Sequence, residues 1–244
     1  MSKIYADTVE PSVPTKDITL GATGDSITIS GNSINTNVIQ DSGGNVLFQS
    51  DGSGTLSNVN SAFAADLKLL SSQTASGASS VSFTSGIDST YDVYIFKFIN
   101  MNPSNNGDGF QVNFSSDGGS NYNMTKTTTA FTSQHYEDNS NAYLSYSTGE
   151  DLAQSTAYQQ LNASLGNGAD ECCDGELYLF NPSSTTYVKQ FYARTNGYIY
   201  VAMSREFYAA GYVNSTSAVN AIDFKMSSGN VMDGIIKMYG ISKS

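Results

Sequence analysis

Apolar and polar side chains alternate along most of the chain after Leu67, and this period of two predicts β-strands. Residues 91–99 are apolar at odd and even positions alike, which is typical of a central strand covered on both faces. Residues 110–114 alternate strictly, so we expect Gln111 and Asn113 to face water. The pattern therefore predicts a β-rich domain over the C-terminal three quarters of the chain.

Further segments carry a strand signal later in the chain: Glu176–Phe180, Tyr187–Ala193, Tyr198–Met203, Ala221–Met226 and Gly234–Ile241. Turn sequences separate these segments at intervals of roughly 8 to 15 residues, as in antiparallel all-β domains. The expected fold of residues 61–244 is an antiparallel β-sandwich of jelly-roll type, a head domain. Ser61 caps at most one or two helical turns before a strand at Leu67–Gln73.

The segment 16–60 has a different pattern, with isolated apolar pairs between glycine-bearing turns. Within Ser26–Ser30 the alternation is strict, and such short strands offer only two or three apolar side chains each. One copy cannot bury them, and a lone short hairpin is marginal in water. We therefore expect a repetitive, intertwined trimeric β shaft. The alternative is a flexible linker rich in glycine and serine.

Residues 1–15 contain Pro11 and Pro14 and no periodic pattern, so they are expected to form an extended tail. The start of the chain lacks the apolar stretch of a secretory signal, and no segment is apolar for long enough to span a membrane. We therefore expect a soluble product of the cytoplasm.

The composition argues against nucleic-acid binding. The net charge is −11, and the chain has only two arginines among its 11 basic residues. A protein that binds DNA or RNA needs a basic surface to neutralise phosphates, and an anionic membrane would repel this chain. We expect neither partner, and no insertion into a membrane.

Cys172 and Cys173 are adjacent, and neighbouring cysteines do not easily meet disulfide geometry. We expect two reduced thiols. A metal site flanked by Asp170, Glu171 and Asp174 is the weaker alternative, because the only histidine lies far away in sequence.

The interval 125–161 is the least regular part of this domain. Its polar and aromatic stretch 134–143 is a candidate recognition loop, with an ordinary surface loop as the alternative. Tyrosine suits glycan or protein contact because it combines flat apolar area with a polar tip. The candidate receptor contacts are Tyr122, His135, Tyr136 and Tyr143. Tyrosines within strands are expected instead in the core or in a trimer interface: Tyr94, Tyr178 and Tyr200.

The motifs of common enzyme classes are missing, and a single histidine leaves little room for a catalytic triad. Two pairs of neighbouring carboxylates, Glu150–Asp151 and Asp170–Glu171, are better explained as solvated loop charges than as a glycosidase pair. Asp117-Gly-Gly and Asp51-Gly-Ser-Gly are expected to form turns rather than calcium sites. We expect a protein that is not an enzyme and has no catalytic residue, bound metal or cofactor.

Several stretches resemble virion fibre-like proteins of tailed bacteriophages, in particular those of aquatic bacteria. They are the leader Lys3–Pro11, the strand regions 69–84 and 86–100, the segment 110–122 and the ending 236–241. The resemblance covers most of the chain but rests on turn and strand patterns rather than on chemical motifs. It implies a homotrimer whose N-terminus docks on other virion proteins. The candidate anchoring residues are Lys3, Ile4, Tyr5, Val9 and Val13.

These observations lead to three hypotheses about function, all placing the chain in a virion. The first is a trimeric tail or baseplate fibre or spike subunit that attaches to a host-surface glycan or protein. The second is a trimeric capsid fibre or head-decoration (cement) protein that binds no receptor. The third is a spike that depolymerises glycans.

Overall fold

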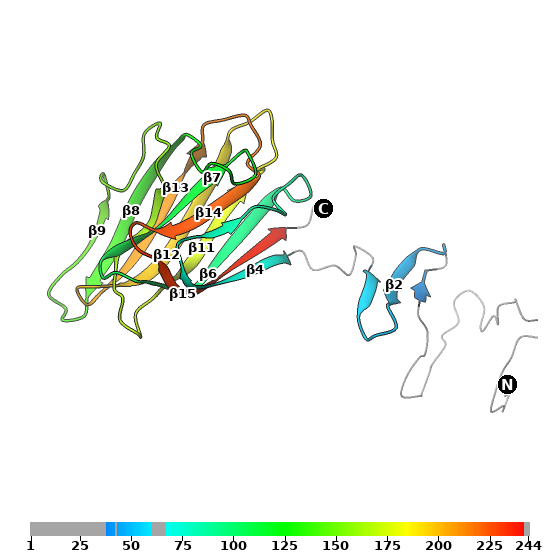
Figure 1. The fold of residues 1–244 in the computed structure, drawn as a ribbon, viewed down its shortest axis with the longest axis horizontal. Helices are drawn as coiled ribbons and strands as arrows, with labels where there is room; N and C mark the ends of the chain where they lie inside the picture. The colour runs from blue at the N-terminus through cyan, green and yellow to red at the C-terminus, as the bar shows by residue number, and fades with distance from the viewer. Residues whose placement is uncertain (1–37, 42, 60–66, 242–244) are drawn as a thin grey trace, which may run out of the picture. The chain divides into compact units, whose positions relative to one another are not determined.

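A computed structural model describes residues 38–41, 43–59 and 67–241. The chain divides into two compact units, Met1–Ala64 and Ala65–Ser244, close to the predicted boundary between shaft and head. Every regular element in the described part is a β-strand, and all strand pairs are antiparallel (Figure 1). The predicted anchoring residues, the shaft up to residue 37 and the possible helical turn at 61–66 lie outside the described residues.

The first unit contains a small three-stranded sheet in the order β1-β2-β3. Its strands are β1 (Val38–Gln40), β2 (Val46–Ser50) and β3 (Leu56–Val59). The turns form as predicted: the Asp41 carboxylate accepts the Gly43 and Asn45 amides at 2.8 and 2.9 Å. The Asp51 carboxylate plays the same part in the second turn, where Gly52 and Gly54 have positive φ.

The described side chains of the small sheet form no core. Among its described side chains none is buried, and Leu56 and Val59 are 55% and 38% exposed. Phe48, its one aromatic residue, is only half-buried. The strands are therefore as short and as poorly covered as the sequence predicts.

The second unit is one large, nearly closed antiparallel sheet. Its strands are β4 (Leu67–Ala78), β5 (Val81–Phe83), β6 (Val93–Pro103), β7 (Asp108–Ser115), β8 (Lys126–Tyr136), β9 (Ala142–Tyr146), β10 (Gln159–Leu165), β11 (Cys173–Phe180), β12 (Lys189–Ile199), β13 (Met203–Val213), β14 (Ala221–Met226) and β15 (Val231–Ile241).

Two groups of four strands account for most of this sheet, one in the order β4-β15-β6-β11 and the other in the order β5-β14-β7-β10. β12 continues the first group, and a single residue pair, Leu165 with Ile199, links it to β10. Beyond β12 the sheet extends through β13 and β8 to β9 at the edge. The predicted antiparallel all-β class is confirmed.

An aromatic cluster joins the two groups of strands. The ring of Phe224 on β14 lies between 5.2 and 6.4 Å from four other rings: Phe96 and Phe98 on β6, Phe83 on β5 and Phe110 on β7. All five side chains are almost completely buried. The inner faces of the two groups therefore pack against each other, and the large unit has its own core.

The central strand predicted over residues 91–99 is confirmed as β6, which lies between β15 and β11. The strand predicted at Tyr198–Met203 and the irregular segment predicted at 125–161 were both wrong. Residues 200–202 form the turn between β12 and β13, so Tyr200 is 51% exposed rather than in the core. The interval 125–161 contains β8, β9 and the start of β10, so the candidate recognition loop is part of a β-hairpin. Threonine and serine occupy many of its positions, and they carry no hydrophobic signal although threonine favours strands.

Asn113 was predicted to face water, but it is buried beneath Lys126. The Lys126 ammonium donates to Asn113 Oδ1 at 2.7 Å and to the Met124 carbonyl at 3.0 Å. Both side chains are fully buried, and burial lowers the pKa of Lys126 to about 8. Hydrogen bonds from Asn113 to the Tyr122 and Thr156 carbonyls complete this polar cluster.

Candidate functional site

The structure brings together three of the four predicted receptor contacts. His135 and Tyr136 end β8, and Tyr143 lies on the paired strand β9. Tyr122 lies before the start of β8, an 11-residue strand that spans roughly 33 Å, and its buried hydroxyl has no hydrogen-bond partner. It is therefore far from the other three.

The three residues of the hairpin do not share a face. Tyr143 is paired with Gln134, to which its hydroxyl donates at 2.7 Å, whereas His135 is paired with Ala142. Since successive residues of a strand point to opposite faces, His135 and Tyr143 point in opposite directions. Tyr136 is half-buried and packs against the core. Only His135 lies on the solvent side of the neighbouring strand β13, opposite Ser204.

That solvent side, formed by β11, β12, β13 and β8, is called the outer face below. Its side chains alternate with core residues, most clearly on β12, where Gln190, Tyr192, Arg194 and Asn196 are exposed between buried neighbours. The rings on the outer face come from all four strands: Tyr178, Phe180, Tyr192, Tyr208, Tyr212 and Phe131. The outer face is thus an aromatic surface set on the rigid strands of the sheet.

These rings form two stacks, each across a pair of strands. Tyr178 and Tyr192 are cross-strand partners, with ring centroids 4.8 Å apart and planes inclined by 16°. Tyr208 and Phe131 are partners in the same sense, at 4.5 Å and 8°. Tyr192 and Phe131 nevertheless remain 42% and 41% exposed. Exposed aromatic area of this kind marks a contact surface more often than it serves stability.

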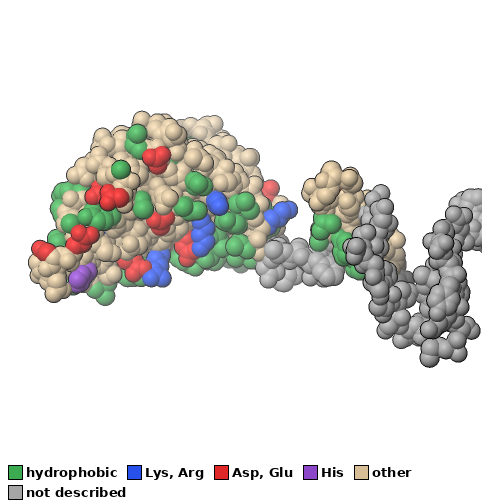
Figure 2. Space-filling view, turned by 90° about the horizontal axis from the view of Figure 1, so that it is seen from below, with side chains coloured by type: hydrophobic (Ala, Val, Ile, Leu, Met, Phe, Trp, Pro, Cys, Tyr) green, Lys and Arg blue, Asp and Glu red, His purple; other side chains and the backbone are tan. Residues whose placement is uncertain are grey.

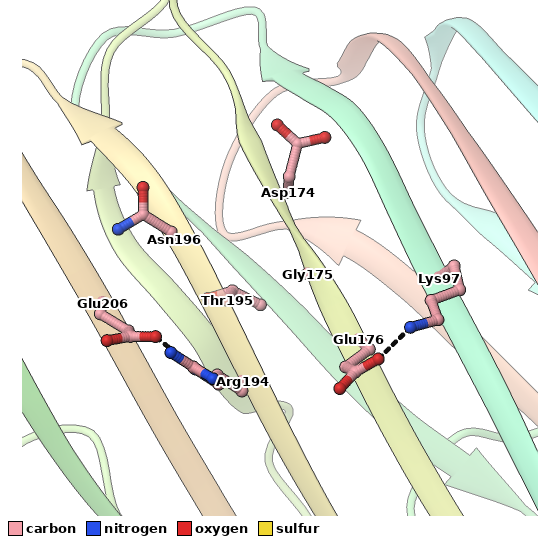
Figure 3. A pocket seen from close by; sticks show the side chains of 8 residues that line it. All are labelled: Lys97, Asp174, Gly175, Glu176, Arg194, Thr195, Asn196 and Glu206. Atoms are coloured by element: carbon pink, nitrogen blue, oxygen red, sulfur yellow. Dashed lines mark hydrogen bonds and ion pairs between the residues drawn. The ribbon is translucent and has the colours of Figure 1, made fainter.

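Two ion pairs lie beside the stacks, one between Arg194 and Glu206 and the other between Lys97 and Glu176 (Figure 3). The Arg194 guanidinium also lies over the Tyr208 ring, 5.5 Å from its centroid. The hydrogen bond from Arg194 is the main cause that lowers the pKa of Glu206, and the hydrogen bond to Glu176 is the main cause that raises the pKa of Lys97. Each of the two cations therefore has a carboxylate partner.

Five adjoining depressions follow β12 and β13 along the outer face, and together they are called the outer-face groove. The first, about 430 Å³, lies between Phe180, Tyr192 and Tyr212. It shares Tyr192 and Ala210 with the second, about 320 Å³, which reaches Phe131 and Tyr208. Figure 2 shows hydrophobic side chains next to neighbouring basic and acidic groups on the face of the large unit seen there.

The groove continues from aromatic to polar lining. The third depression, about 280 Å³, shares Glu176 and Arg194 with the second and is drawn in Figure 3. Two more, each about 220 Å³, extend it past Asn196 to His135. From Gln190 to Tyr198 along β12 this is a length of roughly 26 Å.

The other candidate groups of the sequence are placed elsewhere or serve the fold. Glu150 lies 4.0 Å from Arg205, and Asp151 accepts the Tyr146 hydroxyl at 2.7 Å. Glu171 accepts the Gly168 amide at 2.7 Å, and the Asp117 carboxylate organises its turn.

Cys172 and Cys173 are free thiols, as predicted. Burial is the main cause that raises the pKa of Cys172 to about 11 and that of Cys173 to about 12, so both stay protonated at neutral pH. Among the described residues, no group of three or more His, Cys, Asp or Glu side chains is arranged to hold a metal ion.

The sequence analysis found His135 but not the rest of the groove. Tyr178 was expected in the core or at a trimer interface, and it lies half-buried on the outer face. A signal was available, because Tyr192, Arg194 and Asn196 stand at every second position of a strand whose intervening residues suit a core. What the sequence lacked was the pairing that places β8 and β13 beside this strand.

Comparison of the chain with known protein families, with curated proteins and with solved structures finds no match. Within the described residues, no helix is long and apolar enough to cross a membrane. The case for a function therefore depends on the fold and on the outer-face groove.

Proposed function

We propose that the chain is a structural and attachment subunit of a bacteriophage particle, a homotrimeric fibre or spike protein. Residues 1–15 anchor it to the virion, residues 16–60 form a trimeric β shaft, and residues 61–244 form the head. The head carries the contact surface for the host, and it binds without catalysis.

The strand order of the large unit supports a jelly-roll head. Along the chain these eight strands alternate between the two groups, except that β7 and β10 follow each other within one group. The first group is β4, β6, β11 and β15, and the second is β5, β7, β10 and β14. This winding is that of a double-sheet jelly roll, a common architecture of viral and lectin domains. β8 with β9, and β12 with β13, are then additions that widen one sheet and create the outer face.

The observation that carries the attachment function is the exposed groove with its two ring stacks. A subunit that only staples a shell needs no solvent-facing aromatic rings on the strands of its own stable domain. Rings of this kind on a rigid framework suit recognition instead. Charged neighbours held in ion pairs add polar contacts at fixed positions.

The small sheet supports the trimer. It leaves Phe48, Leu56 and Val59 without full cover, and three copies arranged about a common axis would shelter them. Trimerisation also strengthens attachment, because three linked sites raise the overall affinity by orders of magnitude even when each contact is weak.

The test is to locate the protein on the particle and to measure cell binding. Antibody against residues 65–244 should label fibres or spikes, and the purified chain should bind host cells whether or not residues 1–15 are present. Deletion of residues 1–15 should instead prevent incorporation into particles. Label spread over the capsid, with no cell binding and with fragile particles when the protein is missing, would favour the decoration role. Unlabelled particles would refute the virion assignment.

A further inference from the structure

The second depression of the groove has an open aromatic wall. Tyr178 stacks against Tyr192 from β11, but the residues that follow Tyr192 across the sheet are Ala210 on β13 and Thr129 on β8. Both are small, so the Tyr192 ring borders a hollow of about 320 Å³ whose far side is the Phe131–Tyr208 stack. A flat group with an apolar face fits between these walls.

The same hollow has charged groups at its edge. Arg194 and Glu176 line it, and both belong to the ion pairs described above. A guanidinium has five N–H donors, and the bond to Glu206 engages Nε. A ligand that lies in the hollow therefore meets aromatic faces along its sides and both donors and acceptors at its edge.

A sugar ring matches this combination. One face of a pyranose consists of C–H groups that stack on an aromatic ring, and its rim carries hydroxyls that each donate and accept hydrogen bonds. The groove extends beyond the hollow on both sides. Its whole length along β12 is roughly 26 Å, which is longer than one monosaccharide. Its shape fits a linear chain of sugars.

The charges indicate an uncharged ligand. The lysine and the arginine that line the groove, Lys97 and Arg194, are both paired with carboxylates. Asp174 and Glu137 add further negative charge to the lining, and the whole chain carries −11. A uronic or sialic acid polymer would meet no unpaired cation among these groups and would be repelled.

A second protein surface fits less well. A stable protein contact on this face would take the Lys97–Glu176 and Arg194–Glu206 pairs out of water, and the desolvation cost of such pairs often exceeds their mutual attraction. A sugar chain in an open groove leaves these groups hydrated. From these observations we propose that the outer-face groove binds a linear, neutral oligosaccharide, with Tyr192 as the central stacking residue. The biological role of this site rests on the attachment function proposed above.

The test uses the full-length chain on an array of linear glycans. The array holds neutral oligomers of glucose, galactose, mannose and N-acetylglucosamine in several linkages, beside uronic and sialic acid polymers. Titration calorimetry then measures the affinity for the best neutral glycan. Tyr192→Ala should weaken it by at least about tenfold, since the stacking partner is lost. Tyr192→Phe, which keeps the ring, should bind nearly as the native chain does.

Tyr187→Ala is the matched control, because Tyr187 is 70% exposed and lies outside the groove. It should leave the affinity unchanged, and the denaturation midpoint of each variant should match that of the native protein. Failure of every neutral glycan to bind, a preference for the acidic polymers, or an affinity indifferent to Tyr192→Ala would overturn the inference. A drop in molar mass caused by Tyr192→Ala would also overturn it, since the face would then be a subunit interface.

The outcomes separate this inference from the function on which it rests. If the chain binds host cells but no neutral glycan, attachment stands and the glycan site is wrong. If a neutral glycan binds through Tyr192 while antibody finds no protein on the particle, the site stands and the virion assignment is wrong.

Discussion

The described strands of both units are antiparallel, yet only the large unit has a core among the described residues. In the large unit Phe224 and its four ring neighbours are almost completely buried, whereas in the small sheet no described side chain is. Strand content is therefore a poor guide to independent stability. What differs is the apolar area that each strand can cover within its own chain.

The difference separates the two roles that we assign. A unit with a complete core can keep aromatic rings on its outer face exposed for ligands without losing its fold. The small sheet, in which no described side chain is buried, would gain stability from the association that we propose. The predictions below probe this contrast through the free energy of unfolding, from the largest expected change to the smallest.

The largest change is expected from truncating the centre of the aromatic core. Phe224→Ala removes a ring that four others contact and leaves a cavity, so it should cost the large unit about 3–5 kcal/mol. Urea denaturation followed by tyrosine fluorescence measures this. A loss below about 1 kcal/mol would mean that this cluster does not hold the two groups of strands together.

A pH-dependent change is expected from Lys126. Its pKa is lowered from the ordinary 10.5 to about 8 in the folded protein, so the unfolded chain binds this proton more tightly. The charged form therefore disfavours folding below pH 8, and this cost fades as the pH rises toward 10.5. The stability of Lys126→Met relative to the native protein should fall by about 2 kcal/mol between pH 7 and pH 9.5.

Denaturation of both proteins at the two pH values measures the difference, and tyrosine ionisation, which affects both alike, cancels. Lys68→Met, at an exposed position, is the control for losing one positive charge. A difference that stays constant with pH would show that the buried ammonium is not penalised as the structure implies.

A small change is expected from the ion pairs of the outer face. The Lys97 and Glu176 side chains are 41% and 28% exposed, so their coupling should stay below about 1 kcal/mol and shrink in 1 M salt. A double-mutant cycle with Lys97→Met and Glu176→Gln measures it. A coupling several times larger and insensitive to salt would mark this pair as part of the framework rather than of a hydrated surface.

The smallest change in the stability of the large unit is expected from Phe48→Ala. This residue belongs to the small sheet, so the unfolding midpoint of residues 65–244 should not move. The variant should instead weaken the association of chains, which a dilution series in sedimentation velocity detects. Loss of stability in the large unit would show that the two units depend on each other.

Much of this fold could be predicted from the sequence, because a strand with one apolar face shows a period of two in its apolar residues. β6, β7, β11 and β15 overlap segments predicted as strands but extend beyond them, and β14 has the predicted bounds. β8 was not predicted because its several threonines, three of them consecutive, give no alternation of apolar and polar residues. Lys126 was not singled out in the sequence, and it fills a buried site where Asn113 accepts a hydrogen bond from its ammonium group.

The groove was harder to predict for a different reason. Its walls come from Tyr192, Tyr208 and Phe131, and only the pairing of β12 with β13 and of β13 with β8 makes them neighbours. Long-range register of this kind is set by how the whole sheet closes, which one sequence does not reveal. His135 was found because it is chemically unusual, not because its position was foreseen.

The molar mass of the purified full-length chain in solution tests the account most directly. Light scattering coupled to size exclusion at micromolar concentration should give three times the chain mass of 26.0 kDa, with Phe48→Ala shifting the protein toward single chains. A stable single chain of 26.0 kDa with residues 38–59 ordered would contradict the proposed shaft.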